Sequence, residues 1–356
     1  MITGNVYTFG IGKSGELGSR SNKEIVPFRI RELSSIVQVG NGGSYALCLQ
    51  SNGNLYFFGK GKNARGGSNV DSPVPRHLSY LPKIMMIACG YWHSLVLTES
   101  GFIMASGYNS HGQLGLGSTQ EESKFTSTNT EAKIIKAGGH ASFAITQDNT
   151  LVSCGIRELN AHNQDRLVFT PVMENVEYID IGMVHAGCIS QGQLYMWGNN
   201  AWGQLGIGNT APSSRPIAVA SLAGIQIKQV SCSKGEKYGH TGCIDNDRNV
   251  YMWGSGYKGK LGLDAHWSHE DPADRYIPEV IQNFKADYVE CGGIHSLAIS
   301  DARLFTWGCG SDGRLGHPEV QGHRYLYKEP LPRAIGNLNG VVQVSSSYYS
   351  NIILTN

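Results

Sequence analysis

Four histidines recur in one short motif, and imidazole is the side chain best suited to moving protons near neutral pH. His93, His185, His240 and His295 each follow a glycine-containing turn and precede a short apolar run. A shared metal ion would need several of these rings within bonding distance, and equivalent positions of neighbouring repeat units lie too far apart for that. We therefore interpret each imidazole as a partner for backbone groups at the start of a strand in its own unit.

The other reactive residues are too scattered to form a catalytic site. The eight cysteines stand singly, without the close pairs of a zinc site. His266, His269 and Asp271 form an H-x-x-H-x-D arrangement, but without helical context or a third fixed ligand a solvated loop is the favoured interpretation. The sequence contains no Gly-x-Ser-x-Gly elbow, P-loop or dinucleotide fingerprint. It predicts no catalytic residue, no metal and no cofactor.

Composition narrows the fold and the partners. Glycine contributes 46 of 356 residues and charged residues only 16%, which favours an all-β chain with turns throughout. A net charge of +1 gives no overall field toward nucleic acid or an anionic membrane. Single cysteines, an N-terminus without a signal segment and no apolar run of membrane-spanning length predict an intracellular protein without membrane insertion. Cytoplasm and nucleus are not distinguished.

The histidine motif belongs to a repeat that runs through the whole chain. An aromatic-rich strand ending in an anchor glycine occurs seven times, at Gly10, Gly59, Gly107, Gly155, Gly198, Gly254 and Gly308. Successive anchors are 43 to 56 residues apart, which suits about four short strands per unit. Five anchors are followed by Gly-x-Leu-Gly, at residues 15, 112, 203, 259 and 313. At the histidine position, Gly43, Ala141 and Tyr349 are the expected residues of the other units.

The two ends of the chain carry complementary halves of one unit. The chain opens on an anchor strand, and it closes on the segment that precedes such a strand in the other units. Pairing of the two ends would leave no free sheet edge. The sequence therefore predicts a single domain over residues 1–356: a seven-bladed β-propeller of four-stranded blades, closed by pairing of the N- and C-terminal segments in one blade.

These combined motifs resemble the regulator of chromosome condensation repeat family over essentially the whole chain. The resemblance implies a propeller that recognises another protein. The founding member is a nucleotide-exchange factor for the Ran GTPase, and its exchange face is built from residues in and just before the histidine turn. Here Trp92, Val184 and Ile294 stand where that enzyme carries aspartates, and Glu236 is the acidic residue nearby. This departure argues against exchange activity.

Two further sets of residues are candidates for a partner contact. The fourth unit lacks Gly-x-Leu-Gly after Gly155, and by analogy with the founding member its loop, residues 155–170, is a possible wedge, with ordinary loop drift as the alternative. The wedge candidates are Arg157, Glu158, Asp165 and Arg166. Aromatic tips such as Trp202 and Tyr257 follow the anchors, where they either anchor a partner or pack on a neighbouring loop.

The partner-binding candidates all come from repeat turns and their insertions: Trp92, His93, His111, His185, Trp202, Glu236, His240, Tyr257, Trp267, His295 and Asp312. The leading hypothesis is a non-catalytic protein-interaction propeller that acts as scaffold, adaptor or regulatory subunit. The alternatives are a guanine-nucleotide exchange factor for a Ran-like small GTPase and a structural subunit of a larger assembly.

Overall fold

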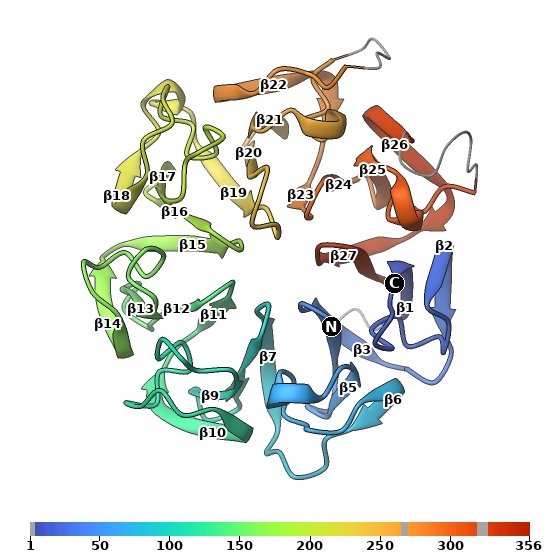
Figure 1. Ribbon diagram of the computed structural model, residues 1–356, viewed down its shortest axis with the longest axis vertical. Helices are drawn as coiled ribbons and strands as arrows, with labels where there is room; N and C mark the ends of the chain where they lie inside the picture. The colour runs from blue at the N-terminus through green and yellow to red at the C-terminus, as the bar shows by residue number, and fades with distance from the viewer. Residues whose placement is uncertain (1–3, 265–269, 319–326) are drawn as a thin grey trace.

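A ring of β-sheets surrounds a central axis in the computed structural model, which describes residues 4–264, 270–318 and 327–356 (Figure 1). Within these ranges, 28 strands form seven four-stranded antiparallel sheets, the blades. Short 3₁₀ turns are η1 (Lys62–Ala64), η2 (Ala220–Leu222), η3 (Tyr257–Gly259) and η4 (Ser311–Gly313). The predicted seven-bladed all-β propeller is confirmed.

The blades are numbered along the chain, and each is given from its innermost to its outermost strand. Blade 1 contains β3 (Ile36–Asn41), β4 (Tyr45–Gln50), β5 (Leu55–Gly59) and β6 (Ser72–His77). Blade 2 contains β7 (Ile84–Cys89), β8 (His93–Thr98), β9 (Phe102–Gly107) and β10 (Glu122–Glu131). Blade 3 contains β11 (Ile134–Ala137), β12 (Ala141–Ile145), β13 (Leu151–Gly155) and β14 (Arg166–Met173). Blade 4 contains β15 (Val176–Ile181), β16 (His185–Ser190), β17 (Gln193–Gly198) and β18 (Ser213–Ala218).

The remaining blades follow the same order. Blade 5 contains β19 (Ile227–Cys232), β20 (His240–Asp245), β21 (Asn249–Gly254) and β22 (Arg275–Lys285). Blade 6 contains β23 (Tyr288–Cys291), β24 (His295–Ser300), β25 (Arg303–Cys309) and β26 (Lys328–Asn339). Blade 7 contains β27 (Val341–Ser346), β28 (Ser350–Thr355), β1 (Asn5–Ile11) and β2 (Lys23–Ile30).

Blade 7 closes the ring with strands from both ends of the chain. β1 pairs with β28 in antiparallel register, from Asn5 opposite Thr355 to Gly10 opposite Ser350. The sequence predicts this pairing of the two ends. Because of it, blade 7 has four paired strands like the other blades, and the ring has no gap between its first and last blades. Gly4 also bridges to Ile36 of blade 1.

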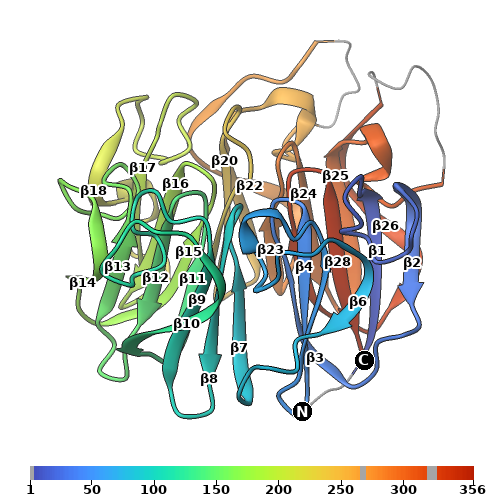
Figure 2. The same cartoon turned by 60° about the horizontal axis from the view of Figure 1, so that its bottom comes forward.

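The two recurrent motifs lie on one face of the ring. Each inner turn, between the first and second strands of a blade, ends where the second strand begins, and His93 there pairs with the anchor Gly107 of the third strand. The outer turn, between the third and fourth strands, therefore starts on the same face. We call it the turn face, and the opposite face, where β1 begins and β28 ends, the terminal face (Figure 2).

Apolar side chains fill the space between neighbouring blades. Trp197, Trp253 and Trp307 of the anchor strands are completely buried. Their Nε1–H groups donate to main-chain oxygens in the outer turn of the preceding blade, those of Leu159 (2.9 Å), Gln204 (2.8 Å) and Lys260 (2.8 Å) respectively. These tryptophan hydrogen bonds thus link each of the three blades to the one before it.

A collar of main-chain hydrogen bonds joins the inner turns around the axis. Gly139 N donates to Gly182 O at 3.0 Å, and Met183 N donates to Ser233 O at 3.0 Å. A Cβ at Gly182 would stand 2.2 Å from Ser233 O, a main-chain atom that cannot move away without breaking the collar. Glycine is therefore required at this position by close approach of two blades.

We expect Gly182→Ala to lower the free energy of unfolding by about 1–3 kcal/mol, because the added methyl group overpacks the collar. Urea denaturation followed by tryptophan fluorescence measures the change. The matched control is Gly336→Ala, where a Cβ meets nothing within 4 Å, and its effect should stay within about 0.5 kcal/mol. Equal midpoints for the two variants would contradict the close-approach argument.

Candidate protein-interaction surface

The four motif histidines are structural residues between blades. His93, His185, His240 and His295 are 0% exposed. Their Nε2 atoms hydrogen-bond to the next blade, at Ser142 (2.8 Å), Thr241 (2.9 Å), Ser296 (3.0 Å) and Asn351 (2.9 Å) respectively. Two expectations are therefore wrong. The rings bond across the blade boundary instead of within their own unit, and burial leaves them no surface for a partner.

The strand register also corrects two assignments at this position. The residues that pair with the anchor glycines in the other blades are Tyr45, Ala141 and Ser350. Tyr45 and Ser350 thus replace the expected Gly43 and Tyr349.

The hydroxyl group that His93 contacts in the next blade connects the histidine motif to the Gly-x-Leu-Gly motif. Ser142 Oγ donates its proton to Gln113 O in the outer turn of blade 2, at 2.7 Å. It must then accept the hydrogen of His93 Nε2, which leaves the buried Nδ1 unprotonated and without a partner among the described residues. Burial lowers the pKa of His93 to about 3, so the ring is neutral at physiological pH.

An aromatic stack lies on the turn face between blades 4 and 5. The half-buried rings of Trp202 and Tyr257 do not touch each other directly, because Tyr238 lies between them. Ring centroids are 4.8 Å apart for Trp202 and Tyr238, and 4.3 Å for Tyr238 and Tyr257, which stack at 14°. Packing onto a neighbouring turn, the alternative considered for these tips, is therefore present.

The sequence analysis did not identify Tyr238 as a candidate contact residue, although a signal was present in the sequence. It lies in residues 233–239, the inner turn of blade 5, which has seven residues where the other blades have three. Its members Glu236 and Lys237 are exposed, and burial together with nearby Glu236 raises the pKa of Tyr91 in the inner turn of blade 2. Gly235 in the same turn approaches Tyr348 of blade 7.

A buried cation lies beneath this stack. Lys260 is 0% exposed, and its Nζ is 5.6 Å from the ring centroids of both Tyr238 and Tyr257. Burial lowers the pKa of Lys260 to about 7. The aromatic stack therefore covers an ammonium group that can lose its charge near neutral pH.

A second aromatic group contains Trp92 and His111 of blade 2 and His140 of blade 3. The ring centroids are 4.6 Å apart for Trp92 and His140, and 5.2 Å apart for His140 and His111. His111 Nδ1 is 3.2 Å from Asp165 Oδ2. Burial, together with neighbouring His111, lowers the pKa of His140 to about 4.

The outer turn of blade 3 is shorter than its counterparts. It spans residues 156–165, the shortest of the seven outer turns as bounded by the described strands. Arg157 and Glu158 are exposed and form an ion pair of 3.0 Å, whereas Asp165 Oδ1 accepts the Arg157 main-chain N–H at 2.9 Å. Arg166 begins β14. The turn has lost residues instead of gaining them, which favours ordinary loop drift, the alternative considered for this loop, over a protruding wedge.

The other candidates differ in their surroundings. Asp312 is half-buried in η4, and its carboxylate lies 3.4 Å from the Arg314 guanidinium. Trp267, with His266 and His269, lies outside the described residues. Asp271 Oδ1 accepts the main-chain N–H of Lys258 at 3.0 Å. Within the described part of the chain, no three His, Cys, Asp or Glu side chains are close enough together to hold a metal ion.

The inner strands around the axis carry a charged cluster that sequence reasoning missed. Asp180 Oδ1 is 3.2 Å from Lys136 Nζ, and Asp180 Oδ2 is 3.5 Å from Lys234 Nζ. Although burial alone would raise it, Lys234 and Lys136 hold the pKa of Asp180 below its usual value. Burial raises the pKa of Glu290, which faces the same ammonium groups. The signal was a charged residue near the end of three apolar inner strands: Lys136 of β11, Asp180 of β15 and Glu290 of β23.

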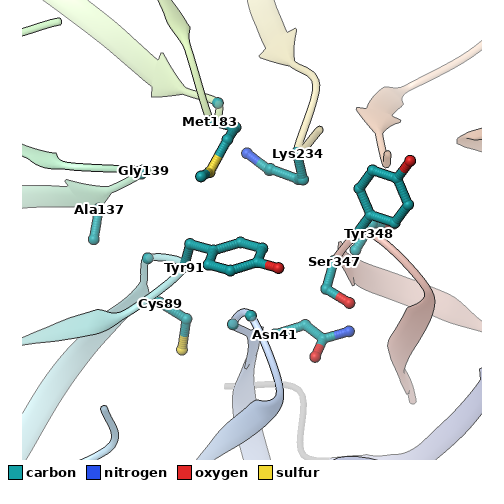
Figure 3. Close-up of a pocket in the computed structure, with 15 residues that line it drawn as sticks. Asn41, Cys89, Tyr91, Ala137, Gly139, Met183, Lys234, Ser347 and Tyr348 are labelled. Atoms are coloured by element: carbon teal, nitrogen blue, oxygen red, sulfur yellow. The ribbon is translucent and has the colours of Figure 1, made fainter. Parts of the chain in front are cut away.

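At the turn face, the inner turns of six blades line a small pocket. Tyr91, Met183, Lys234, Ser347 and Tyr348 surround it (Figure 3). The Lys234 ammonium also donates to Ile181 O at 3.0 Å, so its hydrogen bonds are directed to β15. None of the helices in the described ranges is long and apolar enough to cross a membrane.

The closed seven-bladed ring and its paired turn motifs define a class of repeat protein. The chain belongs to the RCC1-like domain family, whose model matches residues 5–353.

Known proteins of this class resemble it over most of this chain. The ultraviolet-B receptor UVR8 of Arabidopsis thaliana is 28% identical over 89% of this chain and 76% of its own. The regulator of chromosome condensation of Xenopus laevis is 28% identical over 90% of this chain and 70% of its own. The human E3 ubiquitin-protein ligase HERC2 is also 28% identical, over 82% of this chain, but only 6% of the ligase is covered.

Solved structures show the same fold. Prp20p from Saccharomyces cerevisiae superposes with a TM-score of 0.85 at 18% identity, covering 99% of this chain and 91% of that one. Human WBSCR16 also gives a TM-score of 0.85, at 20% identity, and 99% of each chain is covered.

Proposed function

We propose that this protein is a non-catalytic interaction propeller, a scaffold, adaptor or regulatory subunit that binds another protein through its turn face. The observation that carries the proposal is the half-buried stack of Trp202, Tyr238 and Tyr257, which is flanked by the exposed Lys237. Aromatic side chains in such settings are the residues that most often dominate binding energy at protein interfaces. The fold is shared with Prp20p, a protein with binding properties toward Gsp1p and histones, which also favours a protein partner.

We expect Trp202→Ala and Tyr238→Ala each to weaken binding of the principal partner at least tenfold. Each removes an aromatic anchor and opens the stack. The partner is identified by affinity purification with mass spectrometry, and its Kd is then measured with purified components. The control is Phe28→Ala, which removes an exposed aromatic ring from outer strand β2. Unchanged Kd values for both stack variants, with folding intact, would contradict the proposal.

A second candidate, guanine-nucleotide exchange on a Ran-like small GTPase, draws on the comparisons. The human X-linked retinitis pigmentosa GTPase regulator is 26% identical over 84% of this chain and 35% of its own length. The exposed Glu236 in the long inner turn is the acidic residue available to such a partner. Release of fluorescent nucleotide from Ran and a panel of small GTPases tests it. Acceleration that Glu236→Lys abolishes favours exchange, whereas no acceleration alongside a captured partner favours scaffolding.

A further inference from the structure

The outer turns of the ring share one spacing, and blade 3 departs from it. The residue before the leucine of Gly-x-Leu-Gly, or its equivalent, stands six positions after the anchor glycine in six blades: Glu16, Arg65, Gln113, Gln204, Lys260 and Arg314. In blade 3 the equivalent residue is Leu159, only four positions after Gly155. The hydrogen bonds of the tryptophan side chains identify Leu159 as the equivalent residue. Trp197 Nε1–H donates to Leu159 O, as Trp253 Nε1–H donates to Gln204 O. Blade 3 has therefore lost two residues from the tip of its outer turn.

Two outer turns of normal length, those of blades 2 and 4, reach over the groove toward the next blade. Trp202 of blade 4 lies 4.8 Å from Tyr238 in the inner turn of blade 5. His111 of blade 2 lies 5.2 Å from His140 in the inner turn of blade 3. In both cases an aromatic ring occupies the space between an outer turn and the following inner turn.

The shortened tip of blade 3 does not reach that far. Arg157 stands at the tip position, but its side chain is 64% exposed and pairs with Glu158 of its own turn. The groove between blades 3 and 4 is consequently open at the turn face. It is lined by Ile156 and Leu159 of the short turn, by Met183 and Val184 of the next inner turn, and by Pro212. Glu158, whose side chain is 60% exposed, also lines the groove.

We propose that this open groove binds an aromatic side chain, presented by an extended segment of the protein partner, at the place where Trp202 lies in the neighbouring groove. The lining is mainly apolar, and the internal repeats indicate what fits there, since an aromatic ring fills two equivalent grooves of the same ring. Glu158 supplies an acceptor for an indole N–H or a phenol O–H, and its exposed pair with Arg157 is weak enough to exchange. The inference rests on the proposed interaction function and names the chemistry of the partner.

A phage-displayed library of random twelve-residue peptides, panned on the full-length protein, tests the proposal. We expect enriched peptides to share an aromatic residue. In fluorescence anisotropy with a synthetic peptide of the enriched sequence, replacing that residue by alanine should weaken binding at least tenfold. Val184→Trp fills the groove and should weaken binding at least tenfold. The matched control Val168→Trp, at an exposed position of β14, should leave the Kd within twofold.

A second variant keeps the test decisive if Val184→Trp does not fold. Replacing Ile156–Glu158 by the five residues of positions 199–203 restores the normal spacing and places a tryptophan over the groove, so it should also abolish binding. Failure to enrich peptides, enrichment of peptides without an aromatic residue, or binding that survives both groove variants would overturn the proposal. If binding survives them but is lost in Tyr238→Ala, the groove is excluded while the proposed function stands.

Discussion

Acidification from pH 7 to pH 5 is expected to lower the free energy of unfolding by about 2 kcal/mol for each of His93, His185 and His295. Each ring is fully buried, and burial lowers its pKa to about 3. A proton would have to enter at Nδ1, which has no hydrogen-bond partner among the described residues. The three rings together contribute about 6 kcal/mol of this loss, a large share of the stability of a typical domain.

The sign of this pH dependence follows from the protonation of the ring in the folded and the unfolded chain. Above pH 6.5 the ring is neutral in both the folded and the unfolded chain, so it contributes no pH dependence. Between pH 6.5 and about 3 the ring binds a proton in the unfolded chain but stays unprotonated in the folded chain. The folded state therefore loses about 1.4 kcal/mol per pH unit for each ring in this window.

Urea denaturation of the wild type and of His185→Gln at pH 7 and pH 5 isolates one ring. Glutamine cannot titrate, so the variant should lose about 2 kcal/mol less than the wild type on acidification, whatever its stability at pH 7. Contributions from Asp180 and Glu290 cancel in this comparison. The control His77→Gln changes an exposed ring and should follow the wild type. If His185→Gln loses as much stability as the wild type, the neutral-histidine account is wrong.

Removal of residues 350–356 is expected to abolish cooperative folding. β28 is the second strand of blade 7, where it pairs with β27 on one side and with β1 on the other. Its loss detaches β1 and β2 from the sheet and exposes apolar surface now covered by Ile352, Ile353 and Leu354, all at most 1% exposed. His295 also loses its partner Asn351.

The truncated chain should show no cooperative thermal transition and should be digested rapidly by protease. A circular permutant is the control: the original ends are joined by a short Gly/Ser linker, and new ends are opened between Glu174 and Asn175, at the exposed turn between blades 3 and 4. It keeps every strand and should melt cooperatively. A cooperative transition in the truncated chain, near the wild-type temperature, would show that the ring does not depend on this closure.

The fold could be predicted from the sequence because each unit carries its own local signals. The anchor glycines, the Gly-x-Leu-Gly turns and the complementary chain ends together specified blade number, strand number and closure. The partners of the histidines could not be read from one unit, because Ser142 and Thr241 lie 49 and 56 residues away in the next blade. A repeat motif thus shows where a residue recurs but not which neighbour it contacts.

The candidate surface was predicted only in part. Trp202 and Tyr257 were found from their places after the anchors, whereas Tyr238 entered the stack through a turn that is longer in blade 5 alone. The possible wedge rested on analogy with the founding member of the family, since the absence of Gly-x-Leu-Gly alone does not show whether the loop is longer or shorter. The spacing from Gly155 to Leu159 shows a deletion, which was visible in the sequence but interpretable only once the Trp197 bond had fixed the register.

The use of the turn face is tested most directly by hydrogen–deuterium exchange of the full-length protein with and without its purified partner. We predict slower exchange in the outer turn of blade 4 (residues 199–206), in the inner turn of blade 5 (residues 233–239) and around the groove at residues 156–159. Slower exchange confined to the hairpins of the terminal face, such as residues 50–54 and 98–102, would contradict the account.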